Sequence, residues 1–133
     1  MKILFAASEA VPFAASGGLA DVIGSLPAAI NEKGNDCRVV IPLYKSISEQ
    51  YQSELKFVTN LTVDVAWRKQ YCGVFSIVRN GIIYYFIDNE YYFKRDGLYG
   101  FYDDGERFVF FSRAVLEMLK AIEFKPDVIN SND

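Results

Sequence analysis

The sequence predicts an α/β fold, a partial Rossmann-like arrangement of parallel strands with an inserted antiparallel β-meander. Near the N-terminus, two apolar runs flank a glycine pair and a helical pattern, which is typical of a β-α-β unit. The middle of the chain alternates instead with the period of two that indicates strands. With 133 residues, of which 51% are hydrophobic, the chain has the size and apolar content of one domain with a core.

The β-α-β unit is expected to contain a buried strand, a loop, a helix and a second strand, at residues 2–7, 8–18, 20–33 and 36–41. Apolar side chains repeat at helical spacing in the third segment, and Gly34 is a typical residue to end it. Pro27 lies inside the pattern, so we expect it to kink the helix or to lie near its first turns.

The middle of the chain is expected to form three antiparallel strands, at residues 55–67, 70–78 and 82–88. These segments are rich in β-branched and aromatic residues, which favour strands. Asn80-Gly81 separates the last two and predicts a type I′ hairpin turn.

The last third is expected to contain an aromatic loop at 89–105, a helix at 104–122 and a buried strand at 127–130. The helix has one apolar face, and Lys125-Pro126 ends it. Only three parallel strands are predicted, which is few for a doubly wound sheet. We therefore expect part of a larger domain, with an open sheet edge that favours self-association.

The charge and the residue composition of the chain argue against several classes of function. The net charge is −3 without a Lys/Arg cluster, which argues against nucleic acid as a partner, and no apolar run approaches the ~20 residues of a membrane span. Cys37 and Cys72 are expected to be buried free thiols in a reducing, cytoplasmic compartment. The chain has no histidine, which excludes histidine-based catalysis or metal binding within it. Asp96, Asp103 and Asp104 are too sparse for a calcium loop and are expected to be solvated.

Several residues near the expected strand ends are candidate ligand contacts. Gly17 and Gly18 either expose backbone N–H groups at a helix N-terminus, where a phosphate or sugar binds, or supply a turn with positive φ. Asp21 either stabilises the helix dipole or binds sugar hydroxyls, since it would repel a phosphate. Glu9 makes a ligand contact or a local hydrogen bond. Tyr99 stacks on a sugar or packs against its neighbours.

Five segments, in order along the whole chain, closely resemble bacterial glycogen synthases and plant starch synthases. They are MKILFAASE with PF and SGGLADV within residues 1–22, GSLPAA at 24–29, RVVIP at 38–42, YYFIDNEYYFKRDGLYG at 84–100, and DVI with ND within 127–133. The resemblance implies a retaining glycosyltransferase of the GT-B type, with two Rossmann-like domains facing across a cleft. Such enzymes transfer glucose from ADP-glucose to the non-reducing end of an α-1,4-glucan and need no metal or other cofactor.

In this family the N-terminal domain mostly holds the acceptor, and the C-terminal domain mostly holds the nucleotide sugar. Residues 1–133 would then be an incomplete N-terminal domain, inactive without its C-terminal partner. The resemblance implies substrate contacts by Glu9, Ala15, Ser16, Gly17, Gly18, Asp21 and Tyr99, with Asp133 orienting the active site.

The sequence departs from the family pattern at two positions. The family has a lysine facing the donor diphosphate where this chain has Ala15, and a histidine where this chain has Asn130. A second hypothesis is therefore a stand-alone degenerate relative that binds glucan or a protein partner without catalysis. The nearly unbroken match over 84–100 favours the synthase, because a decayed protein would drift in its loops.

Overall fold

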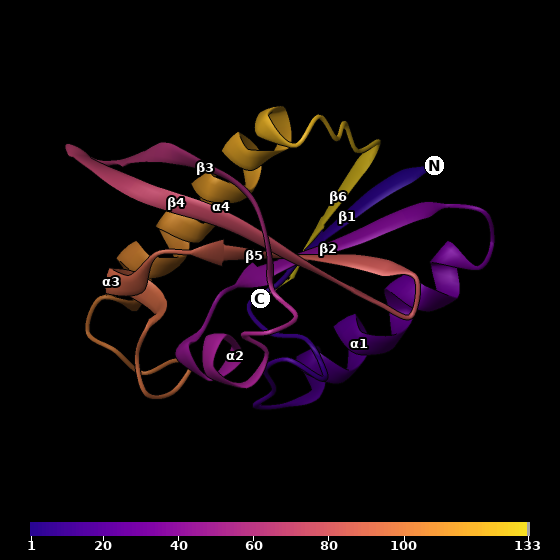
Figure 1. The fold of residues 1–133 in the computed structure, drawn as a ribbon, viewed down its shortest axis with the longest axis horizontal. Coiled ribbons are helices and arrows are strands. Elements are labelled where there is room, and N and C mark those ends of the chain that lie inside the picture. The colour runs from indigo at the N-terminus through magenta and orange to yellow at the C-terminus, as the bar shows by residue number, and fades with distance from the viewer. Residues whose placement is uncertain (133) are drawn as a thin grey trace.

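The computed structural model describes residues 1–132 and contains one mixed six-stranded sheet (Figure 1). Its strands are β1 (Lys2–Ala6), β2 (Asp36–Pro42), β3 (Lys56–Val65), β4 (Arg68–Arg79), β5 (Ile82–Asp88) and β6 (Val128–Ser131). Their order across the sheet is β3-β4-β5-β2-β1-β6. The helices are α1 (Gly18–Asn31), α2 (Lys45–Gln50), α3 (Glu90–Phe93) and α4 (Asp104–Ala121).

Strand β5 joins the two halves of the sheet. It pairs antiparallel with β4 and parallel with β2, so the meander is continuous with the Rossmann-like part. The mixed α/β class and the meander are confirmed, whereas the expectation of three parallel strands is wrong. β5, β2, β1 and β6 are all parallel, because the last meander strand also pairs with β2.

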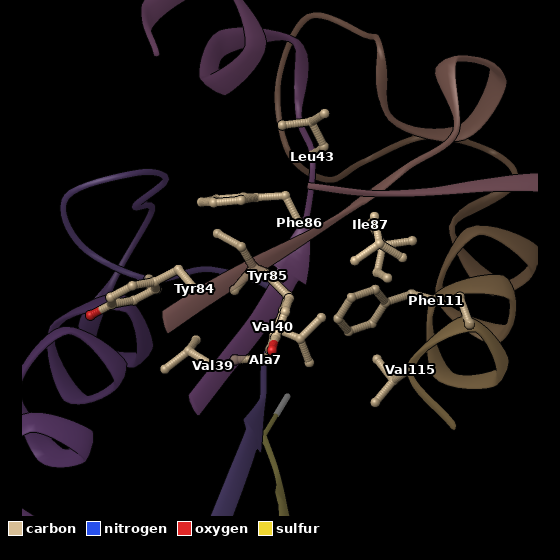
Figure 2. Packing of buried hydrophobic residues seen from close by; sticks show 14 of the residues in the cluster. Ala7, Val39, Val40, Leu43, Tyr84, Tyr85, Phe86, Ile87, Phe111 and Val115 are labelled. Carbon is tan, nitrogen blue, oxygen red and sulfur yellow. The ribbon is translucent and has the colours of Figure 1, made fainter. Parts of the chain in front are cut away.

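Helices cover both faces of the sheet, with α1 and α2 on one side and α4 on the other (Figure 1). Figure 2 shows Phe111 and Val115 of α4 beside Val40 and Ile87 of the sheet. On the opposite face, the ring of Phe86 meets that of Phe13 edge-on, with 5.1 Å between centroids. The core therefore continues on both sides of the central strands.

The turns agree with the sequence where glycine or asparagine directs them. Asn80 and Gly81 both have positive φ, 54° and 75°, as a type I′ hairpin requires. Gly34 follows α1 with φ 87°. The β3–β4 hairpin turns at Ala66, with φ 55°, and no turn residue predicted it.

Several predicted elements need correction. Residues 127–130 do not form a buried strand: β6 is an edge strand of the described sheet, and all four of its residues are exposed. α1 begins at Gly18 and continues through Pro27, which is buried near its middle. The aromatic loop contains the one-turn helix α3, which Asn89 caps by accepting a hydrogen bond from the Tyr92 N–H. α2 was not predicted.

Two further findings concern the described residues as a whole. Cys37 and Cys72 are buried free thiols, as predicted. Within residues 1–132, none of the helices combines the length and the apolar character needed to cross a membrane.

Replacing Gly34 with alanine is expected to lower the free energy of unfolding by about 1 kcal/mol, because a side chain disfavours positive φ. Urea denaturation measures the change. Gly105→Ala is the matched control: it lies in α4, has open space for a Cβ and has no positive φ, so it is expected to stabilise the chain. Equal destabilisation by both substitutions would contradict the prediction.

Candidate functional site

Polar side chains gather at the carboxyl ends of β1 and β6, the edge at which open α/β sheets bind ligands. A cavity of about 510 Å³ lies there, between these strand ends and α4. The residues that line it include Ala6, Ser8, Tyr99, Phe108, Ser131 and Asn132, and the exposed Tyr99 lies at its rim. Apolar side chains of α4 and Ile129 of β6 also line it. A lining that combines hydroxyl groups with apolar groups suits a sugar better than a free anion.

Glu9 holds the loop that leads into α1. Its side chain is only 4% exposed, and one carboxylate oxygen accepts hydrogen bonds from the Ser16 N–H (2.6 Å) and the Ser16 hydroxyl (2.7 Å). The bridge between Ala10 and Ala14 fixes the preceding residues. The carboxylate therefore makes local hydrogen bonds, and it gives the residue before Gly17 a defined place.

The glycine pair is exposed at the N-terminus of α1, and no side chain of residues 1–132 caps this end of the helix. Neither Gly17 nor Gly18 has positive φ, and a Cβ added at either would meet no atom within 4 Å. The interpretation that the turn needs glycine for positive φ is therefore wrong. What the glycines provide is open access to the backbone N–H groups.

Ala15 and Asp21 flank this open backbone. Both are exposed, and the Asp21 side chain makes no hydrogen bond within the described residues. Asn130 lies on β6, where its side-chain oxygen accepts a hydrogen bond from the amide of Asn132 (2.8 Å). Asp133 lies outside the described residues.

Two tyrosines meet at Ser8. The Tyr99 hydroxyl donates to Ser8 Oγ (2.7 Å), and the Tyr44 hydroxyl donates to the Ser8 carbonyl oxygen (2.6 Å). Burial raises the pKa of both phenols, so they are neutral hydrogen-bond donors at neutral pH. Sequence reasoning missed Ser8 and Tyr44. For Ser8 a signal existed, since it is the first polar residue after the apolar run of the first strand.

Two acidic residues make hydrogen bonds within the aromatic loop. Asp103 accepts two hydrogen bonds from the Arg95 guanidinium (2.6 and 2.8 Å), and Asp104 accepts bonds from the Gly100 and Phe101 N–H groups. The expectation that these two carboxylates are solvated is therefore wrong. Among residues 1–132, no group of three or more His, Cys, Asp or Glu side chains is placed to hold a metal ion.

The Arg95–Asp103 pair predicts an acid dependence of stability. The Arg95 guanidinium lowers the pKa of the Asp103 carboxyl from its usual 3.8. The stabilisation is complete above the ordinary pKa and is lost as the pH falls through the lowered one. Urea unfolding between pH 7 and pH 2 is expected to show a steeper acid loss for the natural chain than for Asp103→Asn. Identical pH profiles would contradict this.

Comparisons with known proteins find relatives that are similar in sequence and in fold. Residues 2–133 match the family model described as starch synthase catalytic domain. The chain is 58% identical over its whole length to the glycogen synthase of Geobacillus stearothermophilus, of which it covers 27%. It is 59% identical to the glycogen synthase of Clostridium kluyveri, of which it covers 28%.

A solved structure is also similar. It is the catalytic domain of starch synthase IV from Arabidopsis thaliana bound to ADP and acarbose, with a TM-score of 0.87 and 30% identity. The similarity covers 98% of this chain and 27% of that one. The chain spans about a quarter of the length of the curated relatives it matches. The resemblance and the predicted fold class are confirmed, and the chain belongs to the starch synthase catalytic domain family.

Proposed function

We propose that this chain is the N-terminal, acceptor-side part of a cytoplasmic glycogen or starch synthase. The reaction is transfer of glucose from ADP-glucose to the non-reducing end of an α-1,4-glucan, with retention. The main support is the likeness over nearly the whole chain to a starch synthase domain solved with ADP and acarbose. In this proposal, residues 1–133 are an incomplete Rossmann-like domain that acts with a C-terminal domain.

The residues of the site have distinct proposed roles. The open backbone at Gly17 and Gly18 approaches the donor, while Asp21 accepts hydrogen bonds from sugar hydroxyls. Tyr99 and Ser8 form the polar rim of the cavity that receives the glucan end. Glucosyl transfer also needs oriented donor phosphates and a cleft that excludes water. One wall of a cleft supplies neither, so the chain alone is expected to be inactive.

A chimaera tests the proposal. The 133-residue segment of the Geobacillus stearothermophilus glycogen synthase that matches this chain is replaced by it, and incorporation of radioactive glucose from ADP-glucose into glycogen is measured. The unaltered relative is the positive control. We expect activity from the chimaera and none from the chain alone. An inactive but folded chimaera, together with glucan binding by the chain alone, would support the stand-alone module instead.

We further propose that the chain by itself self-associates through β6. Val128 and Ile129 are 45% and 38% exposed, and only one side of this strand is paired in the described sheet. Sedimentation velocity at rising concentration is expected to show dimers or larger species. Ile129→Lys should reduce them, because an edge lysine opposes strand pairing. A single monomeric species at high concentration would contradict the proposal.

A further inference from the structure

Arg107 is a fully buried cation in the second turn of α4, directly below the aromatic loop. Its Nε donates to the Tyr92 carbonyl oxygen (2.6 Å), and its Nη1 donates to the Leu98 carbonyl oxygen (3.1 Å). Nη1 also donates to Asp104 Oδ1 (2.8 Å). One guanidinium therefore joins three points of the segment from α3 to α4.

We call the Arg107 guanidinium and its hydrogen-bond partners the cradle. Asp104 extends this cradle to the next residues of the loop. Its carboxylate accepts hydrogen bonds from the Gly100 N–H (2.8 Å) and the Phe101 N–H (3.2 Å). Gly97 and Gly100 have positive φ, 93° and 91°, so the chain makes a tight turn here. The cradle thus fixes the backbone on both sides of Tyr99, at Leu98 and at Gly100.

The hydroxyl end of Tyr99 contacts Ser8, in the loop that follows β1. Its hydroxyl meets Ser8 Oγ, and its ring lies 5.9 Å from that of Phe108. A tyrosine side chain is rigid and has few rotamers. A shift of the Tyr99 backbone therefore moves the hydroxyl away from Ser8. The placement of Tyr99 at the cavity rim therefore depends on the cradle.

We propose that Arg107 is a positioning residue that holds Tyr99 against Ser8 at the rim of the glucan-binding cavity. The inference rests on the proposed function for its reference to glucan. Within residues 1–132, every side-chain hydrogen bond of Arg107 goes to the segment 92–104. The Arg107 Nη2 atom is buried and has no hydrogen-bond partner among these residues.

The position suits arginine and not lysine. A cation near the N-terminus of a helix opposes the helix dipole, and a buried charge needs compensation. Asp104 supplies the opposite charge, and the rings of Phe93, Phe101 and Phe108 lie 4.8–5.4 Å from the guanidinium carbon. Lysine keeps the charge but has a single nitrogen, which cannot reach the same acceptors in a planar fork.

The first test follows the Tyr99 ring in the chain by NMR with ring-labelled tyrosine, and Tyr99→Phe assigns its signal. We expect Arg107→Lys to shift this signal. Arg95→Lys is the matched control. It removes the guanidinium that donates two hydrogen bonds to Asp103 in the same loop, and it leaves the hydrogen bonds at Leu98 and Gly100 intact. If Arg107→Lys does not fold, Asp104→Ala, which removes the acceptors for Gly100 and Phe101, is expected to give the same shift. An unchanged Tyr99 signal in a folded variant overturns the proposal.

The second test uses the chimaera. Arg107→Lys is expected to raise KM for glycogen about fivefold with little change in kcat, the effect of losing about one hydrogen bond to the acceptor. In a Tyr99→Phe background the same substitution should leave KM unchanged, because the two residues act together. Equal effects in both backgrounds indicate general destabilisation and overturn the proposal. If the Tyr99 NMR signal shifts but KM does not change, Arg107 positions Tyr99, and the proposed link to glucan binding is overturned.

Discussion

Replacing Ala15 with lysine is expected to strengthen ADP-glucose binding by the chimaera roughly 10- to 100-fold, the effect of one charge-assisted contact. Position 15 is exposed in the loop just before α1. Its neighbours are fixed, Ala14 by backbone hydrogen bonds to Ala10 and Ser16 by the Glu9 carboxylate. A lysine there would stand beside the open backbone of the glycine pair. Isothermal titration calorimetry with ADP-glucose measures the change.

The matched control is Ala29→Lys, which adds the same charge on an exposed position of α1 nearer its C-terminus. This variant should bind ADP-glucose like the parent chimaera. Higher salt should weaken the gain from Ala15→Lys, because ions screen an exposed charge pair. No gain, or an equal gain from both lysines, would show that position 15 does not face the diphosphate.

Replacing Phe86 with alanine is expected to cost about 3–5 kcal/mol of unfolding free energy. Phe86 is fully buried at the centre of the sheet, where β5 joins the parallel and antiparallel halves. Its ring packs against Phe13, which lies in the loop that carries Glu9 and Ser16. Whole domains are stable by only about 5–15 kcal/mol, so we expect this variant to be largely unfolded at 37 °C.

Trp67→Ala is the control for Phe86→Ala. Trp67 is 84% exposed at the β3–β4 turn, so its removal creates no cavity and should change stability little. Urea denaturation followed by far-ultraviolet circular dichroism compares the variants without relying on tryptophan fluorescence. Similar losses for both substitutions would contradict the packing assigned to Phe86.

The parts of the fold that were predictable are those determined over short distances in sequence. The β-α-β unit, the Asn80-Gly81 hairpin and the helix over 104–121 each follow from local periodicity and turn residues. The position of Glu9 directly after the first strand also placed it at the ligand-binding edge of the sheet. Local signals suffice there because the carboxyl ends of parallel strands share that edge.

What could not be predicted depends on distant partners. The pairing of β5 with β2 changes the count of parallel strands, and no feature of either segment specifies it. The hydrogen bond from Tyr44 to Ser8 joins residues 36 positions apart. Nothing in the sequence singled out Arg107, because two of its three side-chain acceptors are main-chain carbonyl oxygens, which leave no mark in the sequence.

The pairing of β6 with β1 has a consequence for synthesis of the chain. The Lys2 N–H donates to Asp127 Oδ2 (2.8 Å) across 125 residues, whereas β4 and β5 meet across a two-residue turn. Hairpins form in microseconds, while a ribosome adds roughly 5–20 residues per second. The outer edge of β1 therefore stays unpaired for many seconds of translation, and we expect nascent chains to bind chaperones until β6 emerges.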